Sequence, residues 1–121
     1  MSISIVGNVN KHIEKLLALP SVADNNIYIS SGNLKHMQSA HPEDYKQYGS
    51  ELKNILKHPD YVGQNPRDGS IEYVKEFVIN DQYVKVAVRL SGTNRYYARS
   101  LYVLNNNRVK NYISKGTLKK I

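Results

Sequence analysis

The 121-residue sequence contains no cysteine, no tryptophan and a single phenylalanine. The lack of cysteine excludes disulfide bridges, thiolate catalysis and cysteine-based zinc sites. The sequence also lacks the long apolar segment of a signal peptide or of a membrane-spanning helix. We therefore expect a cytoplasmic protein with no membrane association.

Acidic residues are scarce as well. The sequence has ten Asp and Glu and seventeen Lys and Arg, which gives a net charge of +7. Such an excess favours a polyanionic partner, most simply nucleic acid. The alternative is a surface charge that only prevents aggregation. The ten tyrosines offer flat rings for nucleobases and hydroxyls for phosphate, but tyrosine also serves at half-buried positions of any sheet. We expect only tyrosines beside arginines to bind a ligand.

The length predicts one α+β domain over residues 1–121, with helices in its first half. Asn10 can cap a first helix, and Ser30 or Ser31 can cap a short second one. Pro42 suits the first turn of a longer helix, whose apolar residues recur at helical spacing.

The second half is strand-like. Asn80-Asp81 forms a two-residue hairpin signal, and Ser91–Arg95 forms a second turn. We expect an antiparallel sheet of about four strands, packed by two or three helices. The segments that belong to this half are IEYVKEFVI, QYVKVAVRL, RYYARSLYVL and, before a basic tail, RVKNYI.

These hairpins place Ile79 opposite Gln82 and Arg89 opposite Tyr97, and so predict which residues share a face. The expected core face holds Ile71, Tyr73, Lys75, Phe77, Ile79, Val84, Val86, Val88 and Leu90. The other face holds Glu72, Glu76, Lys85, Arg89, Tyr97 and Arg99. A slip or bulge would change this assignment. The charged face could bind an anion or carry only solvated ion pairs.

The four histidines are the candidate proton carriers. His36 lies in the short helix and could be catalytic or structural, whereas His41 suits a cap for the helix that begins at Pro42. Their spacing does not return to one helical face. The sequence contains no HExxH motif either, so we predict no metal site and no cofactor.

Several motifs together resemble a known family: IYISSGNLKHMQSAH, LKNILKHPDYVG, SIEYVKEF, VKVAVRLSG and YYARSLYVL. They are similar to the small nuclease domains of phages and mobile elements in the barnase–EndoU–colicin–RelE superfamily. The resemblance covers residues 27–118 and leaves residues 1–26 as an N-terminal helical extension. It implies helices followed by a four-stranded antiparallel sheet, and metal-independent cleavage of RNA in a bacterial or phage-infected cell.

The resemblance also implies the site residues. Catalytic positions fall on His36, Arg89, Arg99 and Ser100, and Lys75 matches the lysine-bearing strand of the family. Together with the charged face, this predicts substrate-binding roles for Lys75, Lys85, Tyr97 and His41.

The predicted function is a metal-independent endoribonuclease, a toxin or a phage RNase, that leaves a 2′,3′-cyclic phosphate. Its partners would be RNA (tRNA, mRNA or rRNA) and possible immunity or antitoxin proteins. One alternative is a non-catalytic RNA- or DNA-binding module, which does not need His36. The other is a protein-interaction adaptor, whose binding would lack a steep salt dependence.

Overall fold

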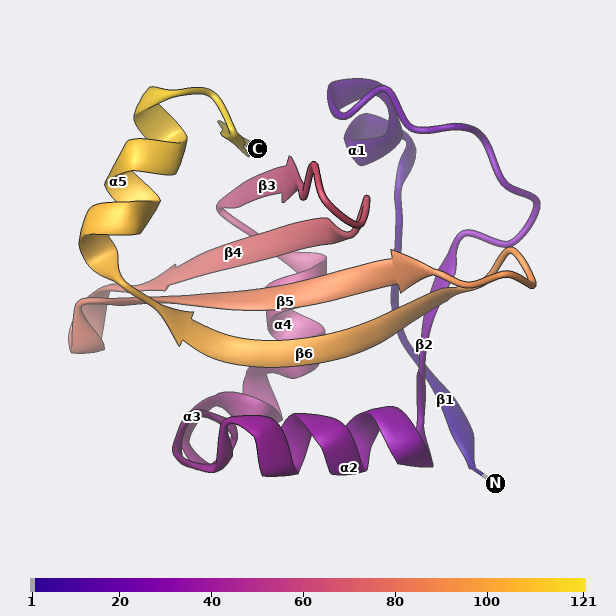
Figure 1. The fold of residues 1–121 in the computed structure, drawn as a ribbon, viewed down its shortest axis with the longest axis horizontal. Coiled ribbons are helices and arrows are strands. Elements are labelled where there is room, and N and C mark those ends of the chain that lie inside the picture. Colours follow the sequence, from indigo (N-terminus) through magenta and orange to yellow (C-terminus); the bar gives the residue numbers. More distant parts are fainter. Residues whose placement is uncertain (1) are drawn as a thin grey trace.

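The computed structural model describes residues 2–121 as an α+β fold around one mixed sheet of seven strands (Figure 1). The strands are ordered β1-β2-β6-β5-β4-β3-β7. Strands β2 and β6 run parallel, and the other neighbouring pairs run antiparallel. The strands are β1 (Ile3–Asn8), β2 (Asn26–Ser30), β3 (Tyr61–Gln64), β4 (Ile71–Phe77), β5 (Gln82–Leu90), β6 (Tyr96–Leu104) and β7 (Leu118–Lys120). The α-helices are α1 (Lys11–Leu16), α2 (Ser31–Ala40), α3 (Pro42–Tyr48), α4 (Leu52–Lys57) and α5 (Asn106–Ser114).

The predicted α+β class is confirmed, but the prediction of about four antiparallel strands after N-terminal helices is wrong, because the sheet has seven strands, is mixed and includes the N-terminal segment. Strand β1 lies in the segment expected to be a helical extension, and it exists because its backbone pairs with β2. The segment RVKNYI lies in α5, which begins after Asn105, whose side chain accepts from the backbone N–H of Asn107 and Arg108. Short strands such as β3 and β7 carry too little periodicity to be recognised without their partners.

The predicted helix starts are confirmed. The Asn10 side chain accepts from the Ile13 N–H at 2.9 Å, Ser30 forms a capping box with Asn33, and Pro42 occupies the first turn of α3. The expected long helix is divided into α3, a 3₁₀ turn from Gly49 to Glu51, and α4.

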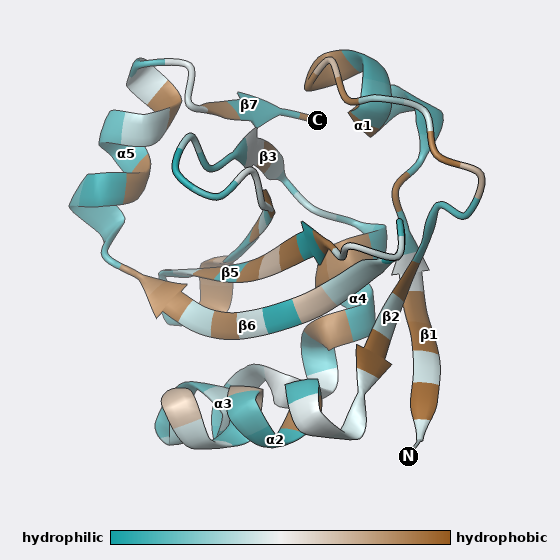
Figure 2. Cartoon of the chain, turned by 45° about the vertical axis from the view of Figure 1, so that its right-hand side comes forward, coloured by the Kyte–Doolittle hydropathy of each residue, from teal (hydrophilic) through white to brown (hydrophobic). Residues whose placement is uncertain are grey.

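The inner face of the sheet packs against α1, α4 and Met37 of α2, and forms the main core. Figure 1 shows α4 behind the central strands, and in Figure 2 the strands carry brown, apolar bands whereas α5 is largely teal. Five of the predicted core-facing residues are buried: Ile71, Tyr73, Val84, Val86 and Val88. Ile79 is 99% exposed and Leu90 37% exposed, because both lie where their hairpins turn away from the core.

The first hairpin differs from its predicted register by two residues. The structure pairs Phe77, not Ile79, with Gln82. Residues Val78–Asn80 leave the strand as a 3₁₀ turn, and Asp81 follows in the left-handed region with φ of 50°. A shift of two keeps every side chain on its predicted face, since strand faces alternate with period two. The second hairpin is confirmed, with Arg89 opposite Tyr97.

The outer face of the sheet is only partly covered. Helix α5 packs one end of it, where Val74, Val109 and Leu118 form a second, small core. Helices α2 and α3 pack against β6, and Asp44 accepts from the backbone N–H of Val103 at 3.0 Å. The region between them stays open and carries most of the predicted site residues.

Candidate active site

A cavity of about 200 Å³ opens on the outer face between α2, the loop that precedes β4, and the strands β5 and β6. It is lined by His36, Asp68, Ser70, Ala87, Arg89, Arg99 and Ser100. The structure thus brings together the four residues predicted to be catalytic: His36, Arg89, Arg99 and Ser100. Their proximity is a structural observation, whereas their catalytic roles are predictions.

A β-bulge in β6 explains how neighbouring residues reach the same cavity. Val88 pairs with Ala98 and Ala87 pairs with Ser100, so Arg99 is an extra residue between them. In a regular strand Ser100 would point to the core if Arg99 pointed outward. The bulge turns both to the outer face, while Ala98 and Leu101 on either side are fully buried. Bulges of this kind re-aim side chains beside functional sites.

Arg89 and Arg99 are both exposed, and neither has a carboxylate within ion-pair distance among residues 2–121. The two-residue register shift explains why Arg89 has no carboxylate opposite it. The predicted register would have placed Glu72 opposite Arg89, whereas the structure pairs Glu72 with Ala87. Continuing the observed register by one residue brings Ser70 next to Arg89. Both guanidinium groups are thus free to bind an anion, and their planar fork suits phosphate oxygens.

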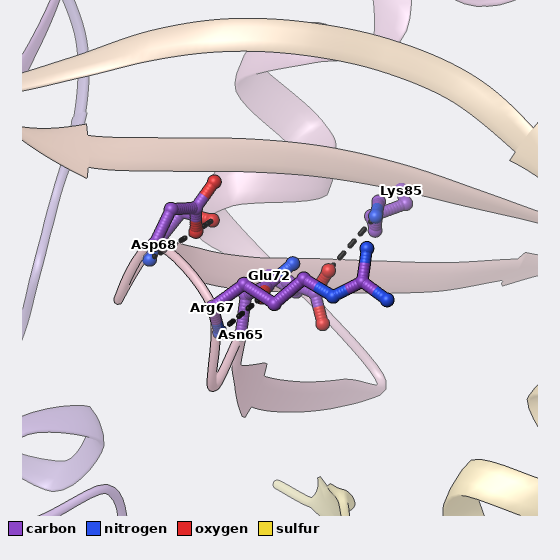
Figure 3. A network of polar contacts seen from close by, with 6 residues as sticks. Asn65, Arg67, Asp68, Glu72 and Lys85 are labelled. Carbon is purple, nitrogen blue, oxygen red and sulfur yellow. Dashed lines mark hydrogen bonds and ion pairs between the residues drawn. The ribbon is translucent and has the colours of Figure 1, made fainter.

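Asp68 and Ser70 are the polar cavity residues that were not predicted from the sequence. One Asp68 carboxylate oxygen accepts from the Ser70 hydroxyl at 2.6 Å and from the Ser70 N–H at 2.9 Å. These two hydrogen bonds lower the pKa of Asp68 from its ordinary value of 3.8, and Arg89 contributes a smaller Coulombic effect. Figure 3 shows Asp68 in the loop before β4, together with Asn65 and Arg67. The Asp-Gly-Ser sequence directly before a strand indicated a polar turn at this position. Only the observed register of β4 with β5 shows that this turn lies beside Arg89.

Lys85 lies on the same face but outside the cavity lining. Its Nζ donates to Glu72 at 2.8 Å and lies 4.7 Å from the ring centre of Tyr102. Burial lowers the pKa of Lys85, but its interactions with Glu72 and Tyr102 outweigh the effect of burial and raise the pKa above its ordinary value of 10.5. The ammonium is charged and already paired (Figure 3).

The other three predicted binding residues are also outside the cavity lining. Lys75 lies on the inner side of β4, opposite Val84, and its Nζ donates to the His58 carbonyl at 2.8 Å. His41 precedes α3 without a side-chain capping bond, and its ring stacks on Tyr102 with centres 4.7 Å apart. Tyr97 lies next to Arg89 on the outer face.

Comparison with protein families shows which family the chain resembles. Residues 4–111 match the sequence profile of the phage-Barnase-EndoU-ColicinE5/D-RelE like nuclease 3 family. The chain belongs to this nuclease family. No curated protein and no solved structure is significantly similar to it.

The family match begins at residue 4 and so includes most of the N-terminal segment that the resemblance left outside. Helix α1 and all of strand β1 after Ile3 are thus part of the region that matches the nuclease family. Among residues 2–121, no group of three or more histidine or acidic side chains is placed to hold a metal ion. No helix in the same range is long and apolar enough to cross a membrane.

Proposed function

We propose that this protein is a metal-independent endoribonuclease that cleaves RNA through attack of the 2′-hydroxyl on the adjacent phosphate. The observation that carries the proposal is one cavity in which a histidine, a carboxylate and two unpaired arginines meet. Phosphodiester cleavage without a metal needs proton-transfer groups and fixed positive charge, and this cavity offers both.

Two groups in the cavity can transfer protons. Asp68 is a carboxylate at neutral pH, as any aspartate with an ordinary pKa is, and its hydrogen bonds with Ser70 lower its pKa further. Its carboxylate can accept the proton of the 2′-hydroxyl. His36, exposed on α2, can donate a proton to the leaving 5′-oxygen. The 2′-oxygen forms a bond to phosphorus as the bond to the 5′-oxygen breaks, which leaves a 2′,3′-cyclic phosphate and a free 5′-hydroxyl.

The arginines would stabilise the charge that develops on the phosphate. Arg89 and Arg99 come from adjacent strands and reach the same cavity. Their guanidinium groups can bind non-bridging oxygens in the ground state and more strongly in the pentacoordinate transition state. The Ser100 hydroxyl lies beside them and can donate to one of these oxygens.

The experiment that tests the proposal is incubation of purified protein with total RNA in EDTA, followed by end-group analysis. We expect cleavage with 2′,3′-cyclic phosphate ends, and no cleavage of DNA, which lacks the nucleophile. The variant His36→Ala should cut about 10²-fold more slowly, the usual effect of losing a proton-transfer group. Its folding should change little, because His36 is exposed, and its RNA affinity should change little, because the two arginines bind the phosphate in this proposal.

The matched control is His12→Ala, which removes an exposed histidine of α1 that does not line the cavity. It should cut at the wild-type rate. A requirement for a divalent cation, or full activity of His36→Ala, would contradict the mechanism. RNA binding without any cleavage would favour the alternative of a non-catalytic binding module.

A further inference from the structure

A row of side chains crosses the outer face of the sheet from the cavity toward β1. Arg89 of β5 pairs with Tyr97 of β6, and Tyr97 pairs with Tyr28 of β2. Paired residues point to the same face, and neighbouring strands lie about 4.8 Å apart. These three side chains, which we call the tyrosine row, therefore lead away from the proposed phosphate position at right angles to the strands.

The two rings of the tyrosine row are held in place by contacts of their own. The ring centres of Tyr28 and Tyr97 are 6.0 Å apart, with planes tilted by 41°. The Tyr28 hydroxyl donates to Asp24 at 2.7 Å, and the other oxygen of Asp24 accepts from the Asn26 N–H. Both tyrosines are half-buried, so part of each ring is accessible. A ligand that stacks here meets rings that are already positioned, which lowers the entropy cost of binding.

A second cavity, of about 550 Å³, lies beside the far end of the row. It opens between residues 20–24 and the turn that joins β5 to β6, and both Asp24 and Arg95 line it. The exposed Arg95 guanidinium lies 5.3 Å from the centre of the Tyr28 ring. The tyrosine row thus runs from the proposed catalytic cavity toward a second cavity, where Tyr28 contacts the lining residues Asp24 and Arg95.

We propose that the tyrosine row and Arg95 bind the bases of single-stranded RNA next to the scissile phosphate. Tyrosine faces and guanidinium planes stack on any base, whereas arginine also attracts the backbone phosphates. Duplex RNA cannot use such a row, because its bases are stacked inside the helix. The inference rests on the proposed function for the position of the scissile phosphate at Arg89, but base binding by the row does not depend on cleavage.

The test measures the affinity of the wild type and variants for a single-stranded 2′-O-methyl RNA octamer, which lacks the nucleophile and cannot be cut. Tyr28→Leu should weaken binding about tenfold, within the range for one lost stacked base. Tyr28→Phe keeps the ring and loses only the bond to Asp24, so its affinity should stay near that of the wild type. Arg95→Gln should also weaken binding. This variant should fold normally, because Arg95 lies at an exposed turn position and does not pack in the core.

The matched control is Tyr112→Leu, because Tyr112 is a 38% exposed tyrosine of α5 outside the row. It should bind as the wild type does. A duplex of the same sequence should bind the wild type and Tyr28→Leu equally. If both Tyr28→Leu and Arg95→Gln bound the single strand with wild-type affinity, the proposal that the tyrosine row binds bases would be wrong. The nuclease proposal would remain intact. The reverse result, with weakened binding by these variants but no cleavage by the wild type, would overturn the nuclease proposal alone.

Discussion

The outer face of the sheet carries two kinds of cation only a few residues apart. Arg89 and Arg99 are exposed, line a cavity and have no carboxylate partner within residues 2–121. Lys85, on the same strand as Arg89, is held by Glu72 and covered by Tyr102. The difference shows that a basic strand face does not by itself indicate a binding site. The position of the neighbouring carboxylate decides which cation is free to bind an anion.

The register of one hairpin creates this difference. With the predicted pairing, Glu72 would lie opposite Arg89 and could neutralise it. The observed shift of two residues pairs Glu72 with Ala87, from where its carboxylate reaches Lys85. The same shift brings the Asp68–Ser70 turn to the cavity. An extra turn of the chain at Val78–Asn80 therefore determines the charge at the candidate active site, far along the sheet.

The largest expected effect is that of removing a free cation. Arg89→Ala should reduce the rate of RNA cleavage by about 10²–10³-fold, the usual loss when one preorganised group that stabilises the transition state is removed. Folding should be unaffected, because Arg89 is exposed. Arg108→Ala is the control, since it removes an exposed arginine of α5 that does not line the cavity. Equal rates for both variants would show that the unpaired arginine has no special role.

A somewhat smaller effect is expected at the carboxylate of the cavity. Asp68→Asn keeps an oxygen that can accept from Ser70 but loses the charge, so cleavage should slow by about 10²-fold. The pKa of Asp68 is lowered from 3.8, so the wild type keeps this group ionised until the pH falls below that value. A rate profile from pH 3 to 8 checks both points. Wild-type activity of Asp68→Asn would remove this residue from the mechanism.

The paired cation should affect stability more than catalysis. Lys85→Met leaves the largely buried Glu72 carboxylate without its partner, which should cost about 1–3 kcal/mol of unfolding free energy in urea titrations. The double variant Lys85→Met/Glu72→Leu removes both charges and should recover much of that loss. If Lys85→Met instead abolished cleavage without changing stability, the contrast between paired and free cations would be wrong.

Local sequence signals predicted that Arg89 and Arg99 share a sheet face and that His36 lies on a helix, whereas the catalytic set that includes Ser100 came from the resemblance to the nuclease family. The helix that carries His36 begins at Ser31, directly after the N-cap residue Ser30, whose capping box with Asn33 lies within four residues. The pairing of Arg89 with Tyr97 followed from a recognisable turn at Ser91–Arg95. Asp68 was missed, because a loop residue acquires its neighbours only from the register of the strand that follows it.

The alternation of the central strands and the helix caps could be predicted because each depends on residues close together in the chain, and the excess of positive charge follows from composition alone. The number of strands depends instead on long-range pairing, because β1 pairs with β2 beyond α1, and β7 pairs with β3 from the far end of the chain. That Arg99 and Ser100 share a face depends on the β-bulge in β6, which is visible only in the pairing of β6 with β5. The free charge of Arg89 has the same origin, because a register is a property of two strands and is not encoded in either one alone.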